Sequence, residues 1–291
     1  MAVRRSPQTE RVVGLINLLT AGSRDGVTLT ELAKRLHVSK PTLYPMLETL
    51  TEAGYVVRRP GRKTYHLGPA LIAAGAAAAE HNGVLESARQ AMIDLGEELD
   101  VTCWLFGVED GYLRLLDQAW HSRHRIPYVR VGERFEIAAP RGAVVAAWSG
   151  RSTVDRWFRA GHTPDEARSE YLELLAGIRK SGYAVTLEET PPARMRAIMH
   201  ELVDAITPAE RDALRQRIRS GLAMGAGSLL VHPEPETSYF VRFVEAPILV
   251  EDGHVELVLG CTHLPELTGR EIARIGERVR AHAARAAQLS G

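Results

Sequence analysis

A series of short capped helices separated by one tight turn constrains the fold of this chain more than any other feature. Thr28 and Glu31 have the Thr-x-x-Glu spacing of a capping box, and an amphipathic pattern follows directly. Ser39 is a natural N-cap for the next amphipathic segment, and Gly54 stands where a glycine commonly ends a helix. Together with the apolar stripe in residues 10–19, these signals predict three helices with a tight turn before the third.

Pro45 lies inside the third predicted helix. An interior proline cannot donate a backbone hydrogen bond, here to the carbonyl of Pro41, and costs about 3 kcal/mol. If Ser39 is the N-cap, Pro45 is the sixth helical residue and the helix is kinked. If Thr42 is the N-cap, Pro45 is the third residue, where no intrahelical bond is lost. The lower cost favours the later start.

A basic hairpin follows this helix. Residues 55–57 and 63–67 alternate as strands do, and Pro60-Gly61 suits the central positions of a type II turn. Three helices and a hairpin are typical of a winged helix-turn-helix, in which basic wing residues contact phosphates and the exposed face of the third helix reads bases. The candidate DNA-binding residues are Ser39, Lys40, Thr42, Tyr44, Arg58, Arg59, Arg62 and Lys63.

The charge of the chain is unevenly distributed. Residues 1–68 contain eleven Lys and Arg against five Asp and Glu, a net charge of +6, and the remainder carries −6 because the whole chain sums to zero. A basic first part favours a polyanionic partner for that part alone. The alternatives are a solvated basic face, a three-helix bundle that serves packing only, and a wing that binds protein.

Neither a secretory signal nor a membrane-spanning segment is visible. The N-terminal "MAVRRSPQTERVV" lacks an apolar core, and the longest apolar run, residues 69–79, is about half the length of a transmembrane helix. Cys103 and Cys261 lie far apart and form no CxxC motif, which indicates a reducing compartment. We expect a cytoplasmic protein.

The first part of the chain resembles the isocitrate lyase regulator (IclR) family of bacterial transcription factors. The resemblance rests on "TLTELAKRLHVSKPTLYPMLETLTEAGYV", on the wing ending "TYHLGPAL" and on the alanine-rich helix after it, and it covers roughly residues 8–80. The family has a basic residue where Pro45 stands, so the contact expected from that position is absent. The resemblance implies a homodimer or a dimer of dimers on a palindromic operator, a helical linker, and a GAF-like domain for a small-molecule effector.

The remaining two-thirds of the chain mixes predicted strands and helices, which favours an α+β fold. We expect a winged helix-turn-helix domain at 1–68, a helical linker and dimerisation segment at 69–99, and a GAF-like mixed α/β effector-binding domain at 100–291. The last domain matches the family in "VGERFEIAAPRGAVVAAWS", "LLAGIRKSGYAVTLEE" and "VEAPILVEDGHVELVLGC". An inserted segment at about 190–238, with helical stretches between 194 and 224, exceeds the family norm. It implies a pocket that is remodelled, covered or lost.

The family resemblance also implies effector-binding positions. Arg141 is suited to a bidentate pair with a carboxylate at a helix start. Cys261 has the alternative role of a small core residue, and Trp104, Phe106 and Trp148 are core residues or stacking partners for an aromatic ligand. The patch "HSRHR" at 121–125 is either solvated surface or an anion-recognition element. The candidate effector-binding residues are Ala139, Arg141, Gly142, Val244, Cys261 and Thr262.

No enzymatic or metal-binding motif is complete. The stretch "HELVD" at His200 lacks the second histidine of a zinc protease, so we expect no enzyme activity, no cofactor and no metal site. The sequence predicts a sequence-specific DNA-binding transcriptional regulator whose operator affinity responds to an organic acid or aromatic metabolite. The alternatives are a ligand-independent regulator with a filled pocket and an enzyme built on the sensor domain.

Overall fold

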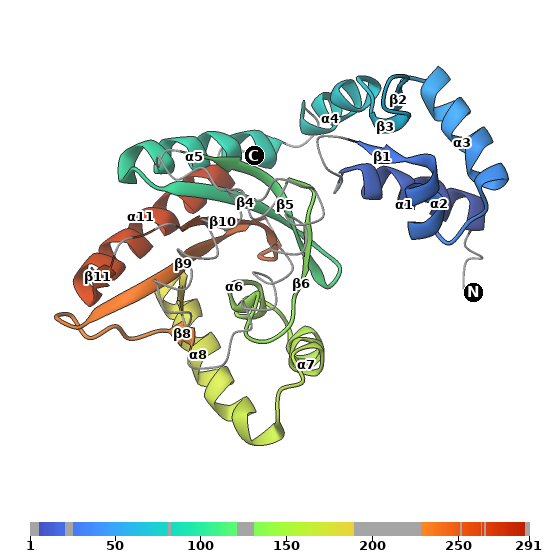
Figure 1. Cartoon of the computed structure of the whole chain (residues 1–291). Coiled ribbons are helices and arrows are strands. Elements are labelled where there is room, and N and C mark those ends of the chain that lie inside the picture. The colour runs from blue at the N-terminus through green and yellow to red at the C-terminus, as the bar shows by residue number, and fades with distance from the viewer. Residues whose placement is uncertain are drawn as a thin grey trace. The chain divides into compact units, whose positions relative to one another are not determined.

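The chain divides into two compact units, Met1–Asn82 and Gly83–Gly291, which are described separately (Figure 1). The predicted linker at 69–99 is shared between them, because α4 (Ala70–Glu80) belongs to the first unit and α5 (Gly83–Leu99) to the second. The patch "HSRHR", the "HELVD" stretch and the helices expected between 194 and 224 lie outside the described residues. The computed structural model describes residues 6–20, 26–80, 83–120, 131–188, 228–250, 252–262, 264 and 266–288.

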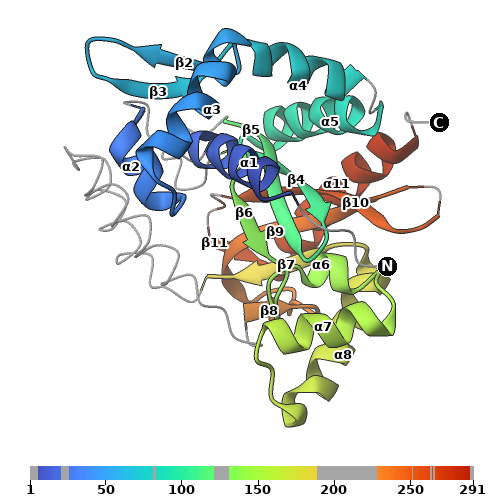
Figure 2. The ribbon, with the colours of Figure 1, turned by 90° about the vertical axis from the view of Figure 1, so that its right-hand side faces the viewer.

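The first unit is a winged helix-turn-helix, as predicted. Its sheet has the antiparallel order β1-β3-β2, and β2 and β3 form the wing, which is seen from the side in Figure 2. Nine buried residues from the helices and strands form its apolar core, among them Leu15, Leu32 and Leu47, each of which is fully inaccessible to solvent. The elements are α1 (Pro7–Thr20), β1 (Val27–Thr28), α2 (Leu29–Arg35), α3 (Lys40–Glu52), β2 (Val56–Arg59) and β3 (Thr64–Leu67).

The boundaries of α3 follow from its caps. Ser39 Oγ accepts a hydrogen bond from Thr42 N at 3.2 Å, so the helix begins at Lys40 and the expected later start at Thr42 is wrong. At the other end Gly54 has φ 73°, and Tyr55 N donates to Leu50 O at 2.8 Å. This pairing is a Schellman motif, in which a left-handed glycine lets the chain turn back on the last turn of the helix.

Pro45 therefore lies in the interior of α3. Pro41, four residues earlier, occupies the second helical position, where the missing N–H costs nothing. Both prolines are exposed, which lets solvent satisfy the carbonyl that Pro45 cannot pair with. The Ser39 cap decided the helix start because it satisfies a backbone N–H at the first turn.

The wing turn also differs from the expected type II turn. Lys63 N donates to Pro60 O at 3.3 Å, and Lys63, not Gly61, has the left-handed backbone, with φ 50°. Residues 60–63 form a four-residue loop between Arg59 and Thr64, which are paired across the strands. Loops of this length are commonly built around a turn at their centre, so the left-handed residue falls at the end.

The second unit is a curled antiparallel sheet with helices on both faces, which confirms the predicted α+β architecture. Its main strand order is β6-β5-β4-β10-β9-β7-β8, and β11 pairs with β9. A hairpin turn joins β9 and β10, and in it Gly253 has φ 79°. The strands are β4 (Thr102–Glu109), β5 (Tyr112–Ala119), β6 (Arg134–Glu136), β7 (Ala184–Leu187), β8 (Leu229–Leu230), β9 (Ser238–Leu249), β10 (Val255–Thr262) and β11 (Glu266–Thr268).

Each face of this sheet carries its own apolar core. Helices α5 and α11 (Gly269–Gln288) cover one face, where Met92 and Val279 pack against the strands (Figure 1). The other face is covered by α6 (Ala143–Ala146), α7 (Arg151–Ala160) and α8 (Arg168–Ser181). The chain between α7 and α8 contains a 3-10 turn, Asp165–Ala167. Among the described residues, no helix is both long and apolar enough to cross a membrane.

Candidate functional site

The eight candidate DNA-binding residues are all exposed, and they lie on two elements of the first unit. Lys40, Thr42 and Tyr44 lie in the N-terminal half of α3, and Ser39 is its N-cap. The other four residues, all basic, belong to the wing. The Ser39 and Thr42 hydroxyl oxygens are 2.7 Å apart, so each already has one local partner. The Tyr44 hydroxyl bonds to Glu48, and this hydrogen bond raises the pKa of Tyr44.

The exposed face of α3 is thus poor in positive charge. Lys40 is the one basic side chain on that helix, and Pro45 and Glu48 are exposed beyond it. The wing, in contrast, presents Arg58 and Arg59 on the edge strand β2 and two further basic residues in the turn. This difference in positive charge is the one expected between a helix that reads bases and a wing that binds phosphates.

The second unit contains a cavity of about 110 Å³. It lies on the sheet face that α6–α8 cover, next to the chain that leads into α6. Its volume is several times the ~10–15 Å³ that admits one water molecule, so it has room for an organic ligand. The cavity surface is mainly apolar, with aromatic and aliphatic walls. Its aromatic and polar lining residues are Thr102, Trp104, Phe106, Gln118, Trp120, Phe135, Arg141, Thr186, Arg242, Phe243, Glu245 and Thr262.

Strand alternation decides which residues reach this cavity. Thr102, Trp104 and Phe106 of β4 line it. Cys103 and Leu105, which alternate with them along the strand, are buried on the opposite face. The same rule places Thr262 on the cavity wall. Successive side chains of a strand point to opposite faces, so a shift of one residue exchanges the two environments.

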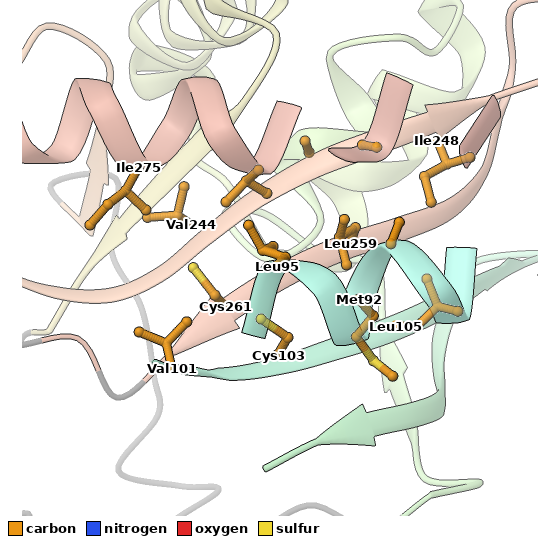
Figure 3. Close-up of a cluster of buried hydrophobic side chains, with 14 of the residues drawn as sticks. Met92, Leu95, Val101, Cys103, Leu105, Val244, Ile248, Leu259, Cys261 and Ile275 are labelled. Atoms are coloured by element: carbon orange, nitrogen blue, oxygen red, sulfur yellow. The ribbon is translucent and has the colours of Figure 1, made fainter. Parts of the chain in front are cut away.

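Two of the candidate effector-binding residues are on the wrong face. Val244 and Cys261 do not line the cavity but pack in the core beneath α5 and α11, where both are completely buried (Figure 3). Cys261 pairs across the strands with Cys103, and burial raises the pKa of Cys261 to about 12. Cys261 is therefore a small core residue with an unreactive thiol, which was the alternative interpretation of the sequence.

Three other candidate residues lie at the entrance to α6. Arg141 and Gly142 line the cavity, whereas Ala139 does not and instead donates its N–H to Trp157 O at 3.2 Å. Gly142 has φ 77°, and a Cβ there would lie 2.9 Å from Ile137 Cγ2, so glycine is required. The carbonyl of Arg141 accepts a hydrogen bond from Trp157 Nε1 at 2.7 Å. This bond fixes the backbone from which the guanidinium extends.

Arg242 reaches the cavity through an irregularity in β9. The pairing with β7 passes from Phe243 to Val241, so Arg242 is the extra residue of a β-bulge. A bulge re-aims a side chain, and here Arg242 lines the cavity together with Phe243. Glu188 pairs with its guanidinium through two bonds, Nε to Oε2 at 2.9 Å and Nη2 to Oε1 at 2.5 Å.

Glu245 is the acidic group of the cavity. Burial raises the pKa of Glu245 to about 7, although the positive charge of Arg141 acts in the opposite direction. Burial also lowers the pKa of Arg141, and the charge of Arg242 lowers it further. Near neutral pH, Glu245 can therefore present either a carboxylate or a neutral acid to a ligand.

Trp104 contributes a hydrogen-bond donor without a partner. Its side chain is buried, with 9% of its surface exposed, and among the described residues no acceptor lies within reach of its indole Nε1. Its ring packs edge-on against Phe243, with centroids 4.7 Å apart, and against Phe106 at 6.0 Å. Trp148, named with Trp104 and Phe106 from the sequence, packs against the apolar cluster of α6–α8 and does not line the cavity.

Sequence reasoning missed Arg242, Phe243 and Glu245. The available signal was the interruption of an apolar strand, "SYFVRFVEAPIL", by two charged residues. In a regular strand residues 242 and 245 point to opposite faces, and only the bulge brings both to the cavity. The described residues include no group of three His, Cys, Asp or Glu side chains that could hold a metal ion.

A winged helix-turn-helix followed by a separate α+β unit with an internal cavity defines a two-domain DNA-binding regulator. Comparison with known proteins agrees, since residues 8–60 match the family model of the IclR helix-turn-helix domain. The HTH-type transcriptional regulator KdgR of Escherichia coli K12 is 26% identical over 189 residues, which are 62% of this chain and 70% of KdgR.

Solved structures extend the similarity over both units. An IclR transcriptional regulator from Alicyclobacillus acidocaldarius has a TM-score of 0.72 and 25% identity, covering 99% of this chain and all of that one. An IclR homologue from Microbacterium hydrocarbonoxydans, solved in complex with 4-hydroxybenzoate, has a TM-score of 0.64 and 15% identity, with 97% of each chain covered. The resemblance to the IclR family of transcriptional regulators that was expected from the sequence is confirmed.

Proposed function

We propose that this regulator binds a palindromic operator in the cytoplasm as a homodimer or a dimer of dimers. A small organic acid or aromatic metabolite in the cavity of the second unit tunes that binding. The observation that carries the proposal is the cavity itself, with a buried arginine and aromatic walls in a chain that also has a winged helix.

The DNA-binding role is divided between the wing and α3. Arg58, Arg59, Arg62 and Lys63 contact phosphates and supply affinity, because such contacts carry no sequence information. Bases are read by the exposed face of α3, which includes Lys40 and the residues near it. The shortage of positive charge on that face supports readout by polar and apolar contacts.

The oligomeric state is supported by α4. None of its residues is buried within the chain, although its sequence, ALIAAGAAAAE, is mostly alanine, and Ile72 is 76% exposed. A helix of small apolar side chains packs closely against a second helix of the same kind. A second copy of this chain is the partner that a palindromic operator requires, since its two half-sites mirror a two-fold axis.

The effector role is supported by the chemistry of the cavity walls. Arg141 supplies a guanidinium suited to a carboxylate, and Trp104 and Phe243 supply rings against which an apolar or aromatic body packs. The complex of the Microbacterium homologue with 4-hydroxybenzoate shows that this fold accommodates an aromatic acid in a related protein. Gly142 and Thr262 complete the proposed site.

The test is operator binding measured by fluorescence anisotropy with labelled DNA from upstream of the gene. Titrations across a salt series, with and without a set of aliphatic and aromatic carboxylates, give the affinity and its salt dependence. We expect tight binding that weakens steeply with salt and that one compound shifts. The Arg141→Gln variant is expected to keep operator affinity and lose the response, whereas Arg278→Gln, on α11 away from the cavity, retains both.

Three results would overturn the proposal. Absence of specific DNA binding would direct attention to the wing as a protein-binding element. Operator binding that no compound shifts, in parent and variant alike, would favour the ligand-independent alternative. Chemical conversion of a bound compound by the purified protein would favour the enzyme alternative instead.

A further inference from the structure

Two of the three charged side chains that line the cavity form no ion pair among the described residues. Arg141, Arg242 and Glu245 are its charged side chains among the described residues. Arg242 is neutralised by Glu188, in the two-bond pair described above. Neither Arg141 nor Glu245 has a side-chain hydrogen bond or an ion pair within 4.0 Å in the part of the chain that the structure describes. One cation and one acid are thus left for a ligand.

Glu245 lies beside the unpartnered indole of Trp104 because of a glycine between them. Gly260 of β10 pairs with Trp104 of β4 on one side and with Glu245 of β9 on the other. A Cβ on Gly260 would lie 2.5 Å from Trp104 Nε1 and 3.1 Å from Glu245 Cγ. Both side chains therefore lean over the bare backbone of Gly260, which places a donor and an acid on the same wall.

The walls around these groups are aromatic. Besides Trp104, the rings of Phe106, Phe135 and Phe243 line the cavity, and successive ring centroids are 4.7–6.0 Å apart. Aromatic faces attract an ammonium group electrostatically, and more strongly where water is excluded. They also pack well against an apolar or aromatic body.

A ligand with one charge leaves one of the two groups uncompensated. A plain carboxylate pairs with Arg141 but gives Glu245 no cationic partner, and where Glu245 is ionised it brings a second negative charge close to it. A plain amine pairs with Glu245 and leaves the guanidinium of Arg141 without a partner. Buried charges are costly unless they are paired. A molecule with both a carboxylate and an ammonium group compensates both, and its carboxylate or another oxygen can accept from Trp104 Nε1.

We propose that the effector is a zwitterion with an aromatic or branched apolar body, of the chemical class of the aromatic amino acids. Arg141 pairs with its carboxylate, Glu245 with its ammonium group, and the rings of Trp104 and Phe243 enclose its body. The inference rests on the proposed function, because it assigns a ligand class to the same cavity.

The test compares matched compounds on the full-length chain by isothermal titration calorimetry. One set is L-phenylalanine, 3-phenylpropanoate and 2-phenylethylamine. A second set with a longer charge separation is 4-(aminomethyl)benzoate, 4-methylbenzoate and benzylamine. In at least one set, the zwitterion is expected to bind at least tenfold more tightly than both singly charged partners.

Variants assign each charge to its group. Glu245→Gln is expected to weaken binding of the zwitterion at least tenfold and to leave binding of the carboxylate no weaker. Arg141→Gln is expected to weaken binding of the zwitterion and of the carboxylate but not binding of the amine. Glu97→Gln, an exposed change on α5 outside the cavity, is the matched control. Far-UV circular dichroism establishes that each variant is folded.

The outcomes separate this inference from the proposed function. If the carboxylate of each set binds as tightly as the zwitterion and shifts operator affinity, the zwitterion inference is wrong and the proposed function stands. If none of the six compounds binds, the zwitterion inference is also overturned. The proposed function, in contrast, falls if operator affinity responds to no compound of either charge class.

Discussion

Replacement of Glu245 by glutamine is expected to change how the stability of the second unit depends on pH. The pKa of Glu245 is about 7 in the folded chain, against 4.5 for an unperturbed glutamate. Each pKa unit corresponds to about 1.4 kcal/mol, so ionised Glu245 costs the folded state about 3 kcal/mol. Glutamine has nearly the same shape and does not ionise, so it removes this cost.

The sign of the effect follows from proton binding. Below pH 4.5 the carboxyl is protonated in both the folded and the unfolded chain, and it contributes no pH dependence. Between pH 4.5 and 7 the folded chain keeps a proton that the unfolded chain has lost, so the free energy of unfolding falls as pH rises. The advantage of Glu245→Gln over the parent is therefore expected to grow by about 3 kcal/mol between pH 4.5 and pH 8.

Urea unfolding followed by tryptophan fluorescence measures the stability difference between the parent and Glu245→Gln in the second unit. All four tryptophans belong to the second unit, so the signal is insensitive to the winged helix. Glu97→Gln is the matched control, because it makes the same chemical change at an exposed position outside the cavity. A stability difference between parent and Glu245→Gln that is the same at pH 5 and pH 8 would refute the assignment of a buried acid to Glu245.

Four further changes test other parts of the molecule. Arg62→Ala is expected to weaken binding to all DNA sequences alike and to flatten the slope of log K against log salt by about one, measured by anisotropy; an unchanged slope would remove the wing from the interface. Pro45→Ala is expected to raise the unfolding free energy of the first unit by up to about 3 kcal/mol, because it restores an N–H inside α3. Urea unfolding of the isolated residues 1–82, followed by circular dichroism, measures this free energy. A loss of stability would contradict the prediction. Pro45→Arg is expected to change the ranking of operator variants more than the fold, and an unchanged ranking would mean that the proline is merely tolerated. Gly260→Ala, which brings a Cβ within 2.5 Å of Trp104 Nε1, is expected to weaken ligand binding at least tenfold. Gly150→Ala is the control, because a Cβ at Gly150 meets no atom within 4 Å. Equal ligand affinities of the two variants would exclude the wall over Gly260 from the site.

Local chemistry made the first unit predictable. The Gly54 stop and the capping residue Thr28 act within a few residues of the chain, and each was found where the sequence indicated. The errors were also local and concerned competition between neighbours. Ser39 prevailed over Thr42 as the cap of α3, and Lys63 took the left-handed position expected for Gly61.

The second unit was less predictable because both faces of its sheet are covered. Helices α5 and α11 on one side and α6–α8 on the other make both faces of the central strands apolar, so the alternation that marks an inward face is lost. Val244 and Cys261 were therefore placed in the cavity one residue out of phase. Thr262 and Arg141 do line the cavity.

The sequence by itself determined the class of the chain: a winged helix with a basic hairpin, and a mixed domain with an arginine before a small-residue helix. Only the tertiary structure decided the contents of the cavity. Trp104, Gly260 and Glu245 meet because β4, β10 and β9 are neighbours, and a bulge in β9 turns Arg242 toward the same cavity, which Arg141 reaches from the chain before α6. The pKa of Glu245 depends on burial by these distant elements, and no stretch of sequence contains that information.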